Sequence, residues 1–318
     1  MTYLAKPRIH HPGLPVNALG FTRRDYEGAV STLCAGCGHD SISAAIIQAL
    51  FELAIEPHRI AKLSGIGCSS KTPTYFLGNS HGFNSVHGRM PSVLTGANLA
   101  NRDLIYLGVS GDGDSASIGL GQFAHCMRRG VNMTYIVENN GVYGLTKGQF
   151  SATSDRGSKS KKGEANRMTP VDPVQLGLSI GATFVARSFS GDKEQQVPIL
   201  KAALAHRGFA LVDVISPCVT FNDHEGSTKS YLHTRENELK ATDADFVPPA
   251  SEIVAHIGQT GVTSVTMHDG SVVQFTRVPA DYDPTDRSKV FSYLQEQNAK
   301  HQIVTGLLYI DETAPDLH

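Results

Sequence analysis

Two polar motifs place oxygen ligands at the ends of apolar segments. Gly111-Asp112-Gly113-Asp114 closes one apolar run, and Asn139-Asn140 closes the next. If both runs are parallel strands, the motifs share the carboxyl edge of one sheet, where open α/β sheets bind ligands. The Asp112 carboxylate and the Asn140 amide are hard ligands for Mg²⁺, and diphosphate oxygens would complete its octahedron. The following loop can add a backbone carbonyl, for which we expect Val142. The motifs therefore predict a Mg²⁺–diphosphate site.

The same glycines admit two other interpretations. Gly111-x-Gly113-x-x-Ala116, with the acidic Glu138 at the end of the next strand, matches a dinucleotide-binding fingerprint. A carboxylate between the glycines would repel a pyrophosphate, however, unless a cation lay between them. Gly-Asp-Gly alone is also typical of a tight turn. The asparagine pair, one strand-helix-strand unit later, favours the metal site over both alternatives.

Four of the five cysteines have placements that suit a metal site. Cys34 and Cys37 have the spacing of a ligand pair, and Cys68 and Cys218 each follow an expected strand end. Four thiolates suit either Zn²⁺ or a [4Fe–4S] cluster, and the spacing does not choose between these metals. A metal site is favoured over buried free thiols. Cys126 lies within an expected helix, where a small buried hydrophobe is the better interpretation.

Several loop residues are candidates for ligand contacts. His87 and Arg89 precede an expected helix, where a cation can meet a diphosphate at the helix N-terminus. Lys71 and Lys147 would attract a substrate carboxylate if the cysteine and diphosphate sites are neighbours. Leu145 would shape the same pocket by contact. A solvated surface role is the ordinary alternative for each of these loop side chains.

Alternating helices and strands are expected to position these residues. Residues 31–245 alternate between helix-like and strand-like segments, which predicts an α/β fold: a parallel sheet with helices on both faces. Within them, the loop over 139–171 has no periodicity, and loops of that length are usually functional. Residues 1–30 predict an N-terminal arm. Residues 246–318 predict a small C-terminal α+β extension that begins with a hairpin around Asp269-Gly270. The expected helices cover 42–53, 91–101, 117–129, 173–180, 193–206 and 285–298, and the expected strands cover 59–64, 103–109, 133–137, 182–187, 209–215 and 302–310.

The composition excludes several classes of protein. The 318 residues are 40% hydrophobic and 18% charged, which is ordinary globular composition and excludes collagen, coiled coils and disorder. A formal net charge of −2 gives no overall basic field for nucleic acid. No apolar run reaches the ~18 residues of a membrane span, and the N-terminal residues do not match a signal peptide. Five cysteines are too few for a disulfide scaffold. We therefore expect a cytoplasmic protein that uses cysteines for metal or redox chemistry.

The motifs together resemble a known family. Gly-Asp-Gly followed one unit later by Asn-Asn is similar to the thiamine diphosphate signature. The fuller text GDGDSASIG, RRG and ENNGVYGLTKGQ resembles the β subunit of 2-oxoacid:ferredoxin oxidoreductases, over roughly residues 30–225. One departure is Gly121-Gln122-Phe123, where many relatives carry a Gly-Asn-His-type stretch. The resemblance implies that residues 31–245 form a thiamine diphosphate-binding and cluster-binding domain.

The resemblance also implies which residues hold thiamine diphosphate, Mg²⁺ and one [4Fe–4S] cluster. The Mg²⁺ ligands correspond to Asp112, Asn140 and the carbonyl of Val142. The cluster ligands correspond to Cys34, Cys37, Cys68 and Cys218. The other expected cofactor-binding residues are Gly67, Ser69, His87, Gly111, Gly113 and Asp114. The residues expected at the substrate are Lys71, Leu145 and Lys147.

The implied reaction is coenzyme A-dependent oxidative decarboxylation of a 2-oxoacid, potentially reversible, with electrons passing through the cluster to ferredoxin. The GLTKGQ stretch looks like the 2-oxoglutarate-type or broad-specificity branch, so 2-oxoglutarate is the first expected substrate. The carboxylate that activates the aminopyrimidine sits on an α subunit in this family, so we expect an αβ or (αβ)2 assembly and an inactive isolated chain. A basic run could attract acidic ferredoxin or coenzyme A phosphates, although such runs are more often simply solvated. It comprises Arg156, Lys159, Lys161, Lys162 and Arg167.

Functions from other classes remain open at this stage. A non-redox thiamine diphosphate-dependent decarboxylase or carboligase would share Asp112 and Asn140, with the cysteines binding a structural zinc ion. A binding module stabilised by a zinc ion would bind no thiamine diphosphate, so Asp112 and Asn140 would not serve a cofactor. Metal and cofactor analysis of an anaerobic preparation distinguishes these functions.

Overall fold

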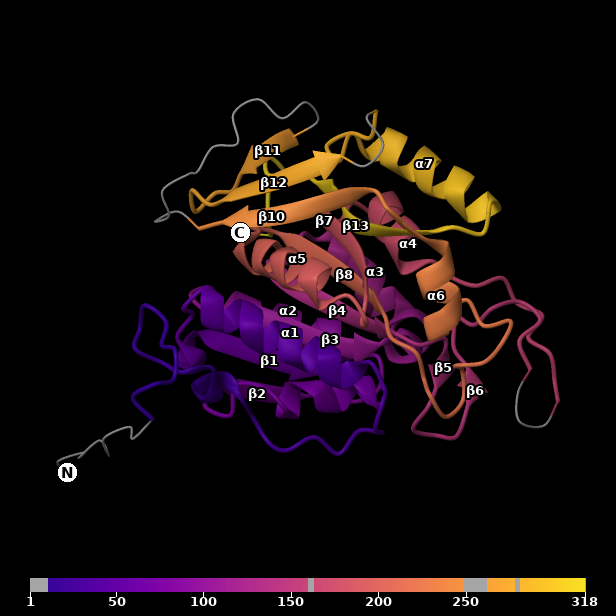
Figure 1. Cartoon of the computed structure of the whole chain (residues 1–318), viewed down its shortest axis with the longest axis horizontal. Helices are drawn as coiled ribbons and strands as arrows, with labels where there is room; N and C mark the ends of the chain where they lie inside the picture. Colours follow the sequence, from indigo (N-terminus) through magenta and orange to yellow (C-terminus); the bar gives the residue numbers. More distant parts are fainter. Residues whose placement is uncertain (1–10, 160–162, 249–261, 278–280, 318) are drawn as a thin grey trace.

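A single eight-stranded sheet forms the centre of the molecule (Figure 1). The computed structural model describes residues 11–159, 163–248, 262–277 and 281–317. The strand order is β2-β1-β3-β4-β8-β7-β13-β9, and the first six strands run parallel. The eight strands of this sheet are β1 (Ile60–Ser64), β2 (His81–Asn84), β3 (Ile105–Gly111), β4 (Met133–Asn139), β7 (Phe184–Phe189), β8 (Phe209–Ile215), β9 (Glu238–Lys240) and β13 (Ile303–Ile310). The expected parallel α/β sheet is confirmed.

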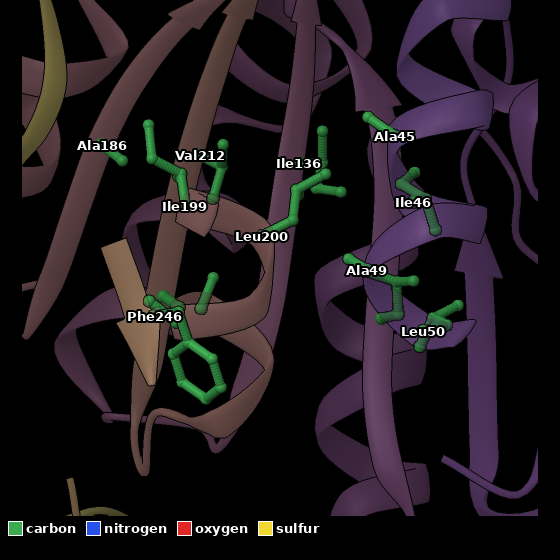
Figure 2. Close-up of a cluster of buried hydrophobic side chains, with 14 of the residues drawn as sticks. Ala45, Ile46, Ala49, Leu50, Ile136, Ala186, Ile199, Leu200, Val212 and Phe246 are labelled. Atoms are coloured by element: carbon green, nitrogen blue, oxygen red, sulfur yellow. The ribbon is translucent and has the colours of Figure 1, made fainter. Parts of the chain in front are cut away.

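Helices cover both faces of this sheet, because apolar side chains project from both. On one face, α1 and α5 pack side by side over β3, β4, β7 and β8 (Figure 2). On the other face, a second buried cluster joins the sheet to α2, α3, α4 and α7. The helices are α1 (His39–Glu52), α2 (Met90–Ala100), α3 (Leu120–Arg128), α4 (Pro173–Ile180), α5 (Lys193–Ala205), α6 (Tyr231–Asn237) and α7 (Arg287–Ala299).

Local signals explain where several of these elements begin. α4, α5 and α7 begin after Asp172, Asp192 and Asp286, whose carboxylates accept hydrogen bonds from backbone N–H groups of the first turn. β4 and β8 are buried along their whole lengths, as central parallel strands must be. Their register pairs Asn139 with Ile215, and the register of β3 with β4 pairs Gly111 with Glu138. The carboxyl ends of the three strands therefore lie level at one edge.

Several short helical turns and a two-stranded hairpin complete the fold around this edge of the sheet. Four short helical turns are η1 (Arg23–Tyr26), η2 (Pro57–Arg59), η3 (Ser69–Thr74) and the π-helical η4 (Gly113–Ile118). A two-stranded hairpin of β5 (Val142–Tyr143) and β6 (Gln149–Phe150) lies inside the loop that was expected to be irregular. The described part of the N-terminal arm is anchored, because the η1 side chain Tyr26 is fully buried. β2, the hairpin and α6 are short elements that the sequence periodicity did not reveal.

The C-terminal residues contribute to two sheets. β10 (Thr242–Val247), β12 (Val272–Arg277) and β11 (Val262–Thr266) form a three-stranded antiparallel sheet, so the expected hairpin is confirmed, apart from Val278, which lies outside the described residues. The last strand, β13, pairs antiparallel with β7 inside the main sheet. The C-terminal residues were expected to form a small appended unit, but β13 extends the main sheet and shares its core. A division of the chain at residue 245 stays a prediction.

No helix in the described part of the chain is both long enough and apolar enough to span a membrane.

Candidate active site

Asp112 is a buried carboxylate held by neutral donors at the end of β3. It is 1% exposed, its Oδ2 accepts from Thr153 Oγ1 at 2.6 Å and from the Ser151 hydroxyl, and its Oδ1 accepts from Asn140 N at 3.3 Å. Burial raises the pKa of Asp112, and these hydrogen bonds oppose the rise. Lys229 also opposes it through space, but its ammonium is engaged in another ion pair. A buried anion in this environment suits a divalent cation.

The two other predicted Mg²⁺ ligands lie beside Asp112 because the chain reverses after β4. Asn140 Oδ1 accepts from Val142 N at 3.0 Å, which folds the backbone into a tight turn. Gly141 between them has φ +71°, and a Cβ on it would lie 2.7 Å from Asn222 Nδ2. A residue with a side chain would therefore be both strained and crowded there. The fold thus brings Asp112, Asn140 and Val142 together at one edge of the sheet.

The neighbouring glycines permit close approach of backbone segments. A Cβ on Gly113 would lie 2.5 Å from the ring of Tyr143, whose hydroxyl donates to the Gly113 carbonyl at 2.9 Å. A Cβ on Gly111 would lie 3.0 Å from Ser69 Oγ. The β5 turn and the segment after Cys68 therefore both pack against the Gly-Asp-Gly turn.

Asp114 braces a neighbouring loop. Its Oδ1 accepts from Gly88 N at 2.9 Å and its Oδ2 accepts from Ser110 Oγ at 2.8 Å. This holds the loop that carries His87 and Arg89, both exposed, next to the cofactor edge. Arg89 donates to Gln122 at 2.8 Å.

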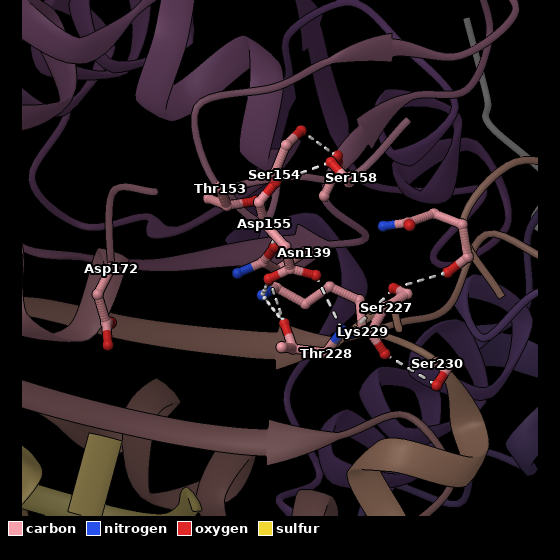
Figure 3. Close-up of polar contacts among 12 residues, drawn as sticks. Asn139, Thr153, Ser154, Asp155, Ser158, Asp172, Ser227, Thr228, Lys229 and Ser230 are labelled. Atoms are coloured by element: carbon pink, nitrogen blue, oxygen red, sulfur yellow. Dashed lines mark hydrogen bonds and ion pairs between the residues drawn. The ribbon is translucent and has the colours of Figure 1, made fainter. Parts of the chain in front are cut away.

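The long loop after the β5–β6 hairpin is tied over the site by the segment before α6 (Figure 3). Thr153 reaches down to Asp112, while Asp155 accepts from Thr228 Oγ1 at 2.6 Å and from Thr228 N at 2.8 Å. Lys229 Nζ lies 3.7 Å from Asp155 Oδ1. These contacts connect the loop that binds Asp112 to the chain that leads to α6.

The four predicted ligand cysteines gather near Gly144, the residue that directly follows β5. Cys68 Sγ and Cys218 Sγ lie 3.6 and 3.5 Å from the point that a Cβ on Gly144 would occupy. Cys218 acts electrostatically on both Cys37 and Cys68, and Cys34 acts on Cys68 and Cys218. The two cysteine pairs, separated in sequence, therefore form one group of thiols.

Backbone donors surround two of these thiols. Burial raises the pKa of Cys37 to about 12, and a hydrogen bond from the His39 backbone opposes the rise. Burial also raises the pKa of Cys218, against hydrogen bonds from the backbone of Thr220, Phe221 and Asn222. Such N–H donors stabilise a thiolate when a metal supplies the compensating positive charge. Cys126 differs: it is fully buried between α2 and α3, and burial raises the pKa of its thiol to about 12.

The thiol group is more open than a single-ion site. Among the described residues, no three His, Cys, Asp or Glu side chains converge tightly enough to share one metal ion. A zinc ion draws its thiolates to about 2.3 Å from one centre, whereas a four-iron cluster is larger and separates its ligands. The geometry of the thiols by itself does not choose between these two groups.

The predicted substrate residues border this region but differ in exposure. Lys71 follows Cys68 on η3 and acts on its thiol electrostatically. Leu145 is 50% exposed, and Lys147 is exposed with φ +78°. Leu145 and Lys147 lie in the turn between β5 and β6, whereas Lys71 lies near Cys68. Gly67, with φ +138°, lies directly before Cys68.

Three functional neighbours were missed by the sequence analysis. Ser151 and Thr153 bind Asp112 from a loop without periodicity, and no local pattern announces such contacts. Glu138, considered only as a dinucleotide ligand, is fully buried and accepts from Thr72 Oγ1 at 2.8 Å. Its Oε2 lies 3.5 Å from His39 Nδ1, and burial holds the Glu138 pKa well above its usual range. These contacts with Thr72 and His39 engage the buried Glu138 carboxyl, which disfavours the role of a ribose ligand that the dinucleotide interpretation gives it.

Comparisons with known proteins agree with this geometry. The family model "Thiamine pyrophosphate enzyme, C-terminal TPP binding domain" matches residues 65–214, which include Asp112, Asn140 and Val142. The 2-oxoglutarate oxidoreductase subunit KorB of Mycobacterium tuberculosis is 35% identical over 89% of this chain and 76% of its own length. The chain belongs to the β subunits of 2-oxoacid:ferredoxin oxidoreductases.

A second relative and a solved structure are also similar to this chain. The 2-oxoacid:ferredoxin oxidoreductase β subunit of Saccharolobus solfataricus is 42% identical over 65% of this chain and 67% of its own length. A solved 2-oxoglutarate:ferredoxin oxidoreductase from Magnetococcus marinus, with 2-oxoglutarate, coenzyme A and succinyl-CoA bound, superposes with a TM-score of 0.76 at 32% identity. The match covers 93% of this chain and 87% of that one. As a β subunit of such an oxidoreductase, the chain works with an α subunit.

Proposed function

We propose that this β subunit carries Mg²⁺–thiamine diphosphate and one [4Fe–4S] cluster, and that with its α subunit it oxidatively decarboxylates 2-oxoglutarate. The observation that carries the proposal is the turn from Val142 to Gly144. Its first residue offers the third Mg²⁺ ligand, and its last packs against Cys68 and Cys218. Only Tyr143 lies between Val142 and Gly144, so the proposed cofactor site and the thiol group are adjacent, as electron transfer between them needs.

The residues of the chain fit the cofactor in defined roles. Bound thiamine diphosphate supplies the electron sink for decarboxylation of a 2-oxoacid. Asp112, Asn140 and the Val142 carbonyl would hold Mg²⁺ against its diphosphate, and Gly111 and Gly113 let the backbone approach. Thr153 and Ser151 orient the Asp112 carboxylate. Their loop helps to exclude water, which strengthens the electrostatic interactions inside the site.

The cysteine group fits a cluster in its donor set and its openness. Cys34, Cys37, Cys68 and Cys218 supply four thiols grouped on the other side of the β5 turn. A cluster there would take electrons from the cofactor one at a time and pass them to ferredoxin, while coenzyme A would accept the acyl group. Cys34 is exposed, so electrons can leave at the surface. A cytoplasmic location suits these reduced thiols.

The substrate assignment rests on cations near the shared turn. Lys71 and Lys147 flank the thiol group, and a charge-assisted hydrogen bond from either ammonium would favour the distal carboxylate of 2-oxoglutarate over pyruvate. The relatives that carry 2-oxoglutarate in their names support this choice. The basic residues Arg156, Lys159 and Arg167 could attract ferredoxin or coenzyme A, whereas Lys161 and Lys162 lie outside the described residues.

The decisive experiment is anaerobic purification of the αβ complex with metal and thiamine analysis. We expect about four irons per β subunit, bound thiamine diphosphate and Mg²⁺, and a brown colour. Asp112→Asn keeps the size of the side chain but removes its charge, so it should lose thiamine diphosphate while retaining iron. Asp245→Asn, an exposed change on β10, is the control. Zinc in place of iron would support a non-redox decarboxylase or carboligase, and full thiamine occupancy in Asp112→Asn would refute the ligand assignment.

A further inference from the structure

Tyr231, the first residue of α6, connects two loops that carry cluster ligands. Its hydroxyl donates to the carbonyl of Gly36 at 3.1 Å, and Gly36 lies between Cys34 and Cys37. Its backbone N donates to Asp223 Oδ1 at 3.0 Å, five residues after Cys218. One residue thus binds both a segment near the N-terminus of the chain and a segment almost 200 residues later.

The ring of Tyr231 is held in place by its own contacts. It packs edge-to-face against Phe189 at the end of β7, with ring centroids 5.5 Å apart. The guanidinium of Arg235, one turn later on α6, lies 5.7 Å from its centroid. Ser230 caps α6 by accepting from His233 N at 3.2 Å. The hydroxyl therefore projects from a fixed side chain, which limits the entropy lost when it forms the bond.

The same segment reaches the Mg²⁺ edge. Asn222, next to Asp223, donates from Nδ2 to the carbonyl of Asn140 at 2.8 Å. Val219 lies against the CxxC turn, with Cγ1 3.8 Å from where a Cβ on Gly36 would stand. The chain from Cys218 to Tyr231 therefore touches a predicted Mg²⁺ ligand through Asn222 and the CxxC turn through both Val219 and Tyr231.

The CxxC turn has few other anchors of this kind. Gly36 has φ +80° and is exposed, and Cys34 is exposed as well. Within the turn, Cys37 N donates to the Cys34 carbonyl at 3.1 Å. That bond fixes the shape of the turn but does not hold it against the Cys218 loop. The Tyr231 hydroxyl adds a hydrogen bond to the CxxC turn, and the Tyr231 backbone N binds Asp223 of the segment after Cys218.

We propose that Tyr231 is a positioning residue for the cluster, and that its hydroxyl sets the separation between the Cys34–Cys37 turn and the Cys218 loop. This rests on the proposed function, since it presumes that the four thiols hold a cluster. The tether does not bind iron itself. It keeps the two ligand loops at the spacing that the cluster requires.

The test compares Tyr231→Phe with wild type in the anaerobically purified αβ complex. Phenylalanine keeps the packing on Phe189 and removes only the hydroxyl. We expect iron content to remain at the wild-type level, and iron release to a chelator to accelerate roughly 2- to 10-fold, the effect of one neutral hydrogen bond. The midpoint potential should become more positive, because water at the freed turn stabilises the more negative, reduced cluster.

Tyr282→Phe is the matched control. Tyr282 also donates from its hydroxyl to a backbone carbonyl, that of Leu308 at 2.8 Å, but it lies against β13. This variant should release iron at the wild-type rate and keep the wild-type potential. Thermal unfolding of each complex checks that the variants are folded.

The outcomes separate the two proposals. Wild-type protein without iron overturns the cluster itself and, with it, the role of Tyr231. Wild-type protein with a cluster, together with a Tyr231→Phe variant of unchanged iron release and unchanged potential, overturns the positioning role alone. Equal acceleration in Tyr231→Phe and Tyr282→Phe would also overturn it, because the effect would then be general loss of stability.

Discussion

Arg187 and Asp213 form a buried ion pair across β7 and β8, with Nε 2.8 Å from Oδ2. Their side chains are 7% and 0% exposed. Asp213 also accepts from Asn139 at 3.0 Å, and Asn139 in turn contacts the Thr153 hydroxyl that binds Asp112. The ion pair therefore supports the strand end that carries the predicted Mg²⁺ ligands.

Removing one partner of this pair should be strongly destabilising. Arg187→Met fills much of the same space but leaves the buried Asp213 without its cation, which costs about 3–5 kcal/mol. Denaturant unfolding of the apo chain measures this loss. Arg156→Met, in an exposed part of the long loop, should change stability by less than about 0.5 kcal/mol. A loss below about 1 kcal/mol in Arg187→Met would contradict a structural role for the pair.

Asp172 also pairs with Arg187 and should make the stability of the folded chain depend on pH. It pairs with Arg187 and caps α4, and this environment holds the pKa of Asp172 below its ordinary 3.8. A depressed carboxyl pKa stabilises the folded state above the unfolded value of 3.8 and loses this contribution as pH falls through the folded value. Asp172→Asn keeps the capping oxygen and removes the charge.

We therefore expect wild type to be more stable than Asp172→Asn at pH 7, with the difference shrinking as pH falls below 3.8. Urea unfolding of both proteins from pH 7 to pH 3 measures the difference directly. A difference that stays constant over this range would show that the charge of Asp172 does not contribute.

The cysteine assignment predicts two classes of variant. Cys34→Ser, Cys37→Ser, Cys68→Ser and Cys218→Ser should each lose most of the iron and the visible absorbance, since each removes a ligand. Cys126→Ser should retain both, because Cys126 lies in the apolar core between α2 and α3. Iron analysis of the five anaerobic αβ preparations decides the question. Iron loss in Cys126→Ser alone would overturn the ligand set.

Lys71 and Lys147 are expected to favour 2-oxoglutarate over pyruvate as the substrate. Lys147→Ala and Lys71→Ala should lower the ratio of kcat/KM for 2-oxoglutarate to that for pyruvate by about 10- to 100-fold in total, the range of one charge-assisted hydrogen bond. Lys159→Ala, an exposed change in the long loop, should leave the ratio unaltered. If neither active-site change moves the ratio, the distal carboxylate is recognised elsewhere, for which an arginine of the α subunit is the natural candidate.

Much of the fold could be predicted because its signals are local. Apolar periodicity located the main helices and the strands β1, β3, β4, β7, β8 and β13 to within a few residues, and the expected α4 and β8 match the observed bounds. β2, β9, β10, α6 and the β5–β6 hairpin were missed. They are too short for a period to emerge, and contacts distant in sequence stabilise them.

The sequence by itself determined the residue types at the site: a carboxylate between glycines, an asparagine pair one unit later, and four cysteines outside helix interiors. These follow from local chemistry, since a strand end and a turn need only their own residues. Tertiary structure alone decided that the Mg²⁺ edge and the thiol group share the turn from Val142 to Gly144. It alone placed Thr153 on Asp112 and Tyr231 on Gly36. Such contacts join residues up to 195 positions apart, and their geometry depends on how the whole sheet and its helices pack, which no local pattern encodes.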